Sequence, residues 1–213
     1  MHAALSEPHR LAIVDALALE DLSPSELAAR TGQPSSLLAH HLGVLEAAGV
    51  VRRRRSDGDG RRSYLTLEWD NPLVAATAVA GHAPAGGRVV FVCSANSARS
   101  QFAASLMARQ GVVDVASAGT EPATTIHPLA LAELGARGMA PVAPAPASAA
   151  DVLRPHDIVV AVCDNAFEGL GRDRVDLHWS IPDPAQGGAD DFRTVFNDLT
   201  PRIGRLVDAL THG

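Results

Sequence analysis

The chain has 213 residues, of which 46% are hydrophobic and 20% charged, and a formal net charge of −6. These values indicate a globular protein of one large domain or two small ones. No apolar run approaches the roughly 18 residues of a spanning helix, and the first residues lack the features of a signal peptide, so we expect a cytoplasmic protein with no membrane partner. Every one of the 18 basic residues is arginine, which excludes a lysine-dependent Walker loop.

Three helices are expected in the first fifty residues. The first starts near Ser6 and ends at about residue 19. The second has Ser23 at its N-cap and Glu26 three residues later, the pattern of a capping box, and it ends near Gly32. The third follows a short turn and ends before Gly49. Two helices joined by a short turn indicate a helix-turn-helix, whose second helix lies in the major groove of DNA.

An arginine-rich hairpin is expected next. Residues 50–55 and 61–67 are typical of strands, and a Gly/Asp turn joins them. Residues 52–62 contain six arginines and two aspartates, a local positive charge that suits contact with a phosphate backbone. A solvated hairpin without a partner is the alternative. Residues 71–80 are expected to form a short closing helix, and the Gly- and Pro-containing residues 81–87 a linker.

Three motifs occur in order up to the start of this hairpin: residues 6–11 (SEPHRL), 26–28 (ELA) and 40–51 (HHLGVLEAAGVV). In that order they resemble the ArsR/SmtB family of winged helix-turn-helix repressors, so the first domain is expected to span residues 1–80. The resemblance implies operator DNA as a partner and a homodimer. No cysteine precedes Cys93, which excludes a thiolate site for arsenite in this domain. The residues implied to contact bases are Ser35, Ser36, Ala39 and His40, and those implied to flank phosphates are Arg52, Arg53, Arg54, Arg55, Arg61 and Arg62.

The third helix carries two adjacent histidines, His40 and His41. Neighbouring residues point to different faces of a helix, so these two side chains do not easily chelate one ion together. We expect one of them to pack in the core and the other to face DNA, and we predict no metal site.

Strands and helices alternate in the second half, from residue 88 to residue 213. Strands are expected at 89–92, 112–119, 157–163 and 174–179, and helices at 100–107, 128–135, 149–154 and 189–210, the last one a single helix or a pair broken at Pro201. This alternation predicts an α/β domain with a four-stranded parallel sheet covered on both faces. In such a sheet, a site lies at the carboxyl ends of the strands, where Cys93 and Cys163 are expected.

The loop after the first of these strands has the composition of an anion site. Cys93 ends the strand, small residues follow, and Arg99 opens the helix. Small residues let the backbone N–H groups turn toward a tetrahedral oxyanion, arginine binds two of its oxygens, and the sulfur is a nucleophile. A buried structural cysteine is the alternative. Asn96 suits a left-handed backbone conformation. The predicted oxyanion-binding residues are Ser94, Ala95, Asn96, Ser97, Ala98, Arg99 and Ser100.

Four motifs occur in order in this half: residues 96–101 (NSARSQ), 117–122 (SAGTEP), 162–166 (VCDNA) and 178–185, which contain HW and DPA. They resemble the low-molecular-weight protein tyrosine phosphatases, and the thiol-dependent arsenate reductases of that fold more than the phosphatases. The phosphatases usually have proline where this chain has Gln101 and an aromatic residue where it has Ala185. The resemblance implies that Cys93 attacks arsenate held by Arg99, that Asp183 is the general acid, and that Cys163 resolves Cys93 as a disulfide.

The physiological reductant is left open by the sequence. Thioredoxin-coupled members carry a third cysteine seven residues after the second, and this chain has Leu170 there. We therefore expect no tightly bound cofactor and a thioredoxin-, glutaredoxin- or small-thiol-type reductant. Two other functions remain open: an oxyanion- or redox-responsive regulator with a non-catalytic sensor domain, and a low-molecular-weight tyrosine phosphatase.

Overall fold

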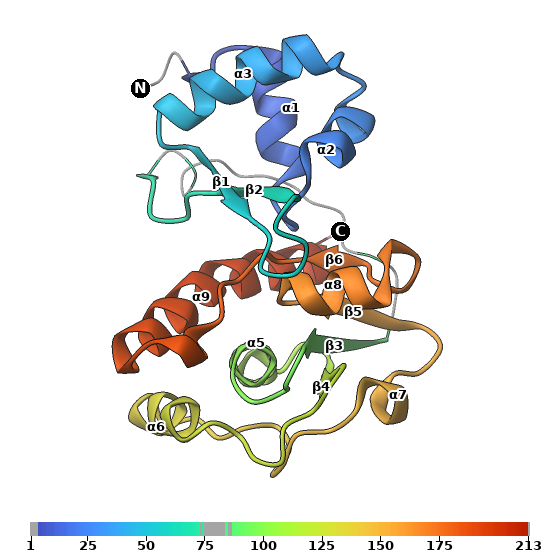
Figure 1. Ribbon diagram of the computed structural model, residues 1–213, viewed down its shortest axis with the longest axis vertical. Helices are drawn as coiled ribbons and strands as arrows, with labels where there is room; N and C mark the ends of the chain where they lie inside the picture. The colour runs from blue at the N-terminus through green and yellow to red at the C-terminus, as the bar shows by residue number, and fades with distance from the viewer. Residues whose placement is uncertain (1–3, 73, 75–83, 85–86, 213) are drawn as a thin grey trace.

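The computed structural model describes residues 4–72, 74, 84 and 87–212, and its helices and strands form two regions (Figure 1). A smaller hydrophobic core is built from residues 13–74 and a larger one from residues 89–206. Tyr64 comes from the first region but packs in the larger core. The closing helix expected over 71–80 and the linker over 81–87 lie largely outside the described residues.

The smaller core belongs to an N-terminal helix-turn-helix domain. It contains α1 (Pro8–Ala16), α2 (Pro24–Thr31) and α3 (Ser35–Ala47). Both hydrogen bonds of the capping box between Ser23 and Glu26 are present at the start of α2. Glu7 caps the N-terminus of α1. The helix ends at Ala16, three residues earlier than expected. The residues after it instead run along the second domain, to which they are hydrogen-bonded.

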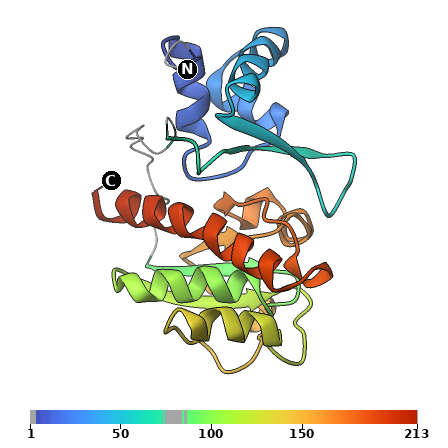
Figure 2. The same cartoon turned by 90° about the vertical axis from the view of Figure 1, so that its left-hand side faces the viewer.

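The hairpin consists of β1 (Val51–Arg55) and β2 (Ser63–Leu67), which pair antiparallel. Successive side chains of a strand point to opposite faces, so the run of four arginines is divided between two surfaces. Arg52 and Arg54 are half-buried, whereas Arg53 and Arg55 are exposed. The hairpin descends from α3 toward the second domain, with its turn beside α8 (Figures 1 and 2).

The C-terminal α/β domain has a four-stranded parallel sheet in the order β4-β3-β5-β6, as predicted. Helix α5 packs on β3, β4 and α9, and Figure 2 shows α9, α5 and α6 side by side across one face of the domain. The elements are β3 (Arg88–Cys93), α5 (Arg99–Gln110), β4 (Asp114–Gly119), α6 (Pro128–Ala136), α7 (Ala149–Val152), β5 (Asp157–Ala161), α8 (Asp164–Leu170), β6 (Leu177–His178) and α9 (Ala189–His212).

Two elements of this domain differ from the expectation, and a choice that the sequence left open for a third is decided. Helix α8 was not predicted, because the strand pattern was extended as far as Cys163, which instead caps α8 two residues after β5 ends. Strand β6 has only two residues. Helix α9 continues through Pro201, since Leu199, Ile203 and Leu206 on one face are buried in the core and offset the backbone hydrogen bond that proline lacks. Within the described ranges, none of the helices combines the length and apolar character that a membrane crossing requires.

Buried polar contacts join the two domains. Asp21 donates its backbone N–H to the His178 carbonyl at 2.7 Å, and its carboxylate accepts the Ser180 N–H at 2.7 Å. Arg202 of α9, which is 2% exposed, donates to Asp21 at 3.0 Å and to Thr66 Oγ1 of β2 at 2.7 Å. Burial opposes the charge of Arg202, but the nearby carboxylates of Asp21 and Asp198 raise its pKa. The guanidinium therefore stays charged in the interface.

Candidate active site and DNA-binding surface

The loop between β3 and α5 is shaped by hydrogen bonds from the segment after β4. Backbone N–H groups of residues 120, 121, 123 and 127 donate to the carbonyl oxygens of residues 93, 94, 95 and 97 at 2.9–3.1 Å. A trans peptide points its N–H away from its C=O, so the N–H groups of residues 94, 95, 96 and 98 face the other side. Helix α5 has no side-chain N-cap, which leaves its first N–H groups available as well. Together these donors form a cup suited to an oxyanion.

Cys93 lies at the base of this cup. Its Sγ accepts the Asn96 N–H at 3.2 Å and is 3.1 Å from Ser100 Oγ. Asn96 has a φ of 50°, the left-handed conformation for which asparagine is suited, and its side-chain amide donates to Ser100 Oγ at 2.8 Å. These contacts hold the sulfur at the base of the loop, where a cysteine can act as the nucleophile toward a bound oxyanion.

Arg99 is the buried cation of the site. It is 4% exposed, and its Nη2 donates to Asp183 Oδ2 at 3.0 Å. Burial opposes its charge, but electrostatic interactions with the sulfur groups of Cys163 and Cys93 and with the carboxylates of Asp183 and Asp57 raise its pKa. Arg99 thus lies within electrostatic reach of both cysteines and of one aspartate from the hairpin.

Asp183 caps a turn with one carboxylate oxygen and contacts Arg99 with the other. Its Oδ1 accepts the Ala185 N–H at 3.0 Å and caps the 3-10 turn Pro184–Gln186, as a turn residue does. Its Oδ2 contacts Arg99 at the site, and 41% of its side chain is exposed. A carboxyl group with one oxygen at the anion site and access to solvent is placed to carry a proton there.

Cys163 lies beside the loop. Its Sγ is 3.6 Å from Ser94 Oγ and accepts the Ala166 N–H at 3.4 Å. The thiol is fully buried, and burial raises its pKa although the charge of Arg99 opposes that shift. Both cysteines therefore meet at one end of neighbouring strands, as their positions in the sequence predict.

Leu170 occupies the position of the third cysteine. It is partly buried against the large core, and it lines an open cavity of about 680 Å³ together with Ser94, Asn165 and Arg174. Nothing at this position can receive a disulfide, so the described site holds two thiols.

Three positions that support the loop were not assigned a role from sequence. Gln101, which is fully buried, donates from Nε2 to the Asn96 carbonyl at 3.0 Å. Ala147 donates its N–H to Asn96 Oδ1 at 2.9 Å. A Cβ at Gly119 would lie 2.5 Å from the Ser94 carbonyl oxygen, so only glycine permits this approach. Gly119 lies in the motif 117–122 and Gln101 in the motif 96–101, and these two motifs were the sequence signals for the contacts.

The predicted base-reading residues are exposed on α3. Helix α3 lies on the side of the molecule farthest from the α/β domain, where a duplex has room to approach (Figure 1). His40 is exposed and His41 is buried, the division expected from their adjacent positions. The exposed residues are Ser35, Ser36, Ala39 and His40.

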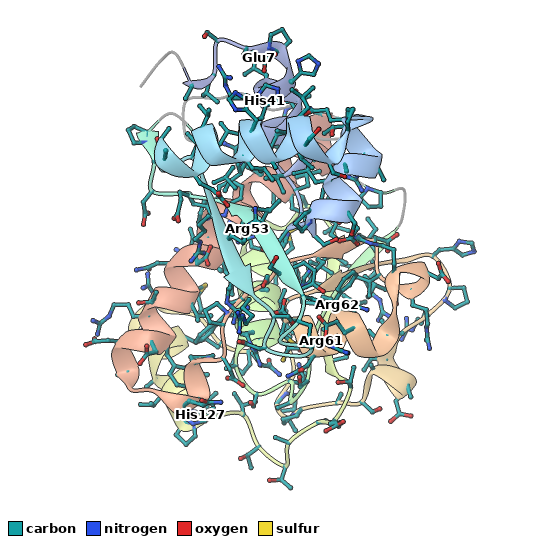
Figure 3. The ribbon with its side chains drawn as sticks, turned by 45° about the horizontal axis from the view of Figure 1, so that its top comes forward. Glu7, His41, Arg53, Arg61, Arg62 and His127 are labelled. Atoms are coloured by element: carbon teal, nitrogen blue, oxygen red, sulfur yellow. The ribbon has the colours of Figure 1, made fainter. Side chains whose placement is uncertain are left out.

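The hairpin arginines are divided between the second domain and solvent. Arg52 Nη2 donates to Asp198 at 3.2 Å, and Arg54 Nη1 donates to Asp164 at 2.7 Å. Neither guanidinium can bind a DNA phosphate with these donors while the contacts persist. The other hairpin arginines, some of which Figure 3 labels, are exposed: Arg53, Arg55, Arg61 and Arg62.

Asp164 is the buried acid that anchors the hairpin near the site. Besides Arg54, it accepts the Asp57 N–H at 2.9 Å and pairs with His178 Nε2 at 3.0 Å. Burial alone would raise its pKa, but the hydrogen bonds from His178 and from the Asp57 N–H lower it. Asp164 directly follows Cys163, so the hairpin is attached next to the second thiol.

Glu168 anchors the hairpin one turn further along α8. Its carboxylate accepts the Ser56 hydroxyl at 2.8 Å, the Asp59 N–H at 2.6 Å and the Tyr64 hydroxyl at 2.8 Å. Burial raises the pKa of Tyr64, and the Glu168 carboxylate adds to that effect. Neither acid of α8 was predicted to contact the first domain.

Two family models match parts of this chain. Residues 88–213 match the model of the low molecular weight phosphotyrosine protein phosphatases. The chain belongs to that family. Residues 5–54 match a helix-turn-helix domain model, so the family's α/β domain is joined here to a helix-turn-helix domain.

Solved structures similar to the phosphatase-family domain include reductases and phosphatases. An arsenate reductase from Archaeoglobus fulgidus is 28% identical, with a TM-score of 0.50, and the match covers 56% of this chain and 98% of that one. The tyrosine phosphatase Wzb from Escherichia coli K30 is 18% identical, with a TM-score of 0.53 over 59% of this chain and 99% of that one. A YwlE mutant from Bacillus subtilis is 23% identical, with a TM-score of 0.52 over 58% and 98%. The last two show the fold alone.

Proposed function

We propose that this protein is an arsenate reductase fused to a DNA-binding repressor domain. The observation that carries the proposal is the second thiol, because Cys163 contacts Ser94 of the oxyanion loop and shares the charge of Arg99 with Cys93. A phosphatase needs one nucleophile, whereas a reductase needs a second thiol to supply the other electron of a disulfide. The 28% identity to an arsenate reductase supports the same activity.

In the proposed reaction, Cys93, Asp183 and Cys163 each take part in one step. Arsenate binds to the loop N–H groups and Arg99, and Cys93 Sγ attacks arsenic to form an S–As bond. One arsenate oxygen leaves as water after Asp183 donates a proton. The Cys163 thiol loses its proton to the departing arsenite as its sulfur attacks Cys93 sulfur, the S–S bond forms, and the electron pair of the S–As bond stays on arsenic. Arsenic(V) is thereby reduced to arsenic(III), and the two thiols are oxidised to one disulfide.

Regeneration requires an external thiol. With Leu170 in place of a third cysteine, a reductant has to attack the Cys93–Cys163 disulfide itself. The cavity lined by Ser94 and Leu170 adjoins the loop, and its volume of about 680 Å³ suits a small thiol or the tip of a redoxin. We propose this cavity as the approach for that reductant.

The test is arsenite production by the full chain with thioredoxin, a glutaredoxin-type protein or a small thiol as the electron donor. We expect at least one of them to support turnover, and Cys93→Ser to abolish it. Cys163→Ser separates the reductase from a phosphatase, because it removes turnover with arsenate but leaves the attack on an aryl phosphate intact. Wild-type protein that hydrolyses aryl phosphate and yields no arsenite with any donor would identify a phosphatase instead.

A second candidate function is regulation of DNA binding by the state of the oxyanion site, and the Arg54–Asp164 contact favours it. Cys163 caps α8 through its sulfur, and a disulfide with Cys93 competes with that cap. Asp164 and Glu168 lie on the same short helix, so loss of the cap weakens their hold on the hairpin. Arg54, which Asp164 holds, then becomes available to phosphate.

This regulation predicts reciprocal coupling. If oxyanion binding or oxidation changes the affinity for operator DNA by some factor, DNA changes the affinity of the site for the oxyanion by the same factor. An operator selected from random duplexes serves as the probe. We expect Asp164→Asn to reduce the coupling, whereas Asp190→Asn, at a side chain 89% exposed, leaves it unchanged. If neither arsenate nor cysteine oxidation changes the operator affinity of the wild-type protein, this function is contradicted.

A further inference from the structure

Three side chains with metal-binding atoms meet in the N-terminal domain. Glu7 caps α1, His9 lies in its first turn, and His41 lies in α3. One ligand atom from each lies within 4.8 Å of the others. Figure 3 labels Glu7 and His41 where the start of α1 lies beside α3. The cluster joins the start of α1 to α3, and His41 follows His9 by more than thirty positions in the chain.

His41 is the most informative member. It is only 6% exposed, and neither ring nitrogen has a hydrogen-bond partner among the residues that the structure describes. Its Nδ1 is 3.6 Å from Glu7 Oε2, which is too long for a hydrogen bond. Burial of polar atoms without partners costs free energy, so a native protein that tolerates it usually has a bound group at that place.

Glu7 and His9 provide the charge and the access. His9 Nδ1 is 2.6 Å from Glu7 Oε1, so the imidazole and the carboxylate are already in contact. The rings of His9 and His41 are stacked with centroids 5.5 Å apart. The side chain of His9 is 53% exposed, so an ion can enter from its side.

We propose that Glu7, His9 and His41 bind a divalent transition-metal ion, for which zinc is the best match. Two imidazoles and one carboxylate are typical zinc ligands, and the open side near His9 leaves a fourth position for water. Ligand atoms on a tetrahedral zinc lie about 3.4 Å apart for bonds of about 2.1 Å. Zinc binding requires the exposed His9 side chain to rotate so that the three atoms reach that spacing.

This site is separate from the oxyanion site. It uses no thiol, and α3 lies at the opposite end of the molecule from β3 and α5 (Figure 1). His41 is adjacent to His40, which is predicted to face DNA bases. A bound ion therefore fixes the start of α1 to the helix that reads DNA, and it stabilises the folded domain because the unfolded chain lacks the site.

The experiment is zinc titration of the chelator-treated full chain by calorimetry, with Tm measured in parallel and cobalt absorption as a report on the ligands. His9→Gln is the test variant, because an exposed side chain can be changed without unfolding the domain. His40→Gln is the matched control, one residue from His41 and also exposed. We expect zinc to bind and raise Tm in the wild type and in His40→Gln, and to bind at least about tenfold more weakly in His9→Gln.

Three outcomes would overturn the proposal. The first is wild-type protein that shows neither zinc binding nor a rise in Tm. The second is a His9→Gln variant with the wild-type Kd, or one weakened no more than His40→Gln. The third is a cobalt spectrum with sulfur-to-metal charge transfer that disappears in Cys93→Ser, which would assign the ion to the cysteines.

Discussion

The oxyanion loop and the arginine-rich hairpin are both polar segments organised around arginine, but they hold it differently. In the loop, Arg99 is buried and donates to Ile181 and Asp183 of its own domain, and the backbone is fixed by neighbours in the same domain. In the hairpin, Arg52 and Arg54 are paired with carboxylates of the other domain. The loop is therefore preorganised for an anion, whereas DNA has to replace carboxylates that already hold two of the hairpin cations.

Removal of the loop nucleophile should have the largest effect. Cys93→Ser is expected to lower arsenate reduction by at least about a thousandfold, because the weaker serine nucleophile cannot form the disulfide. The measurement is the rate of arsenite production with saturating reductant. The hairpin lies outside this step, so Arg53→Gln should retain the wild-type rate, and a large loss in both variants would contradict the separation of the two regions.

The buried ion pair that joins the domains should give the next largest effect. Arg202→Ala leaves Asp21 buried without its partner, and loss of one member of such a pair costs about 3–5 kcal/mol. Unfolding in urea measures this change in free energy. Arg193→Ala is the control, since Arg193 lies on the same helix with 57% of its side chain exposed. Equal effects of the two substitutions would show that the domain contact is not stabilising.

The third prediction concerns Asp183, the residue proposed to donate a proton to the leaving oxygen. If it is the general acid, Asp183→Asn should reduce kcat about a hundredfold while arsenate still binds, because the amide cannot donate the proton. A variant with the wild-type kcat would leave Asp183 with only its role as the cap of Pro184–Gln186.

The smallest effect concerns the acid that holds the hairpin. The pKa of Asp164 is lowered in the folded chain, so its contribution to stability is complete above the unfolded value of about 3.9 and is lost as pH falls through the folded one. Asp164→Asn should therefore destabilise the protein at neutral pH, and the difference from wild type should shrink below about pH 4. A difference that is constant from pH 7 to pH 3 would show that the ionised carboxylate is not what holds Arg54.

Local patterns predicted much of the fold and the oxyanion site. The capping box at Ser23, the left-handed Asn96 and the parallel sheet all depend on residues close in the chain or on a regular alternation. Helix α8 was missed because such local patterns need length. Its seven residues follow a strand-like run and are too few to show a helical period.

Contacts between distant residues could not be predicted in this way. Arg54 and Asp164 are 110 positions apart, and the charge of the arginine run gives no sign of which members face the other domain. The alternation along β1 decides that division, but only once the direction of the hairpin is known. His41 was assigned to packing for a related reason, because its neighbours Glu7 and His9 come from another helix.

A single-turnover reaction without reductant tests the central claim most directly. Reduced full-length protein is mixed with arsenate, quenched and analysed for arsenite, free thiols and disulfide-linked peptides. The account predicts that arsenite appears in proportion to the loss of both thiols, with Cys93 and Cys163 joined in one disulfide. Arsenite formed while Cys163 remains a free thiol, or a chain that retains both thiols and forms no arsenite, would contradict it.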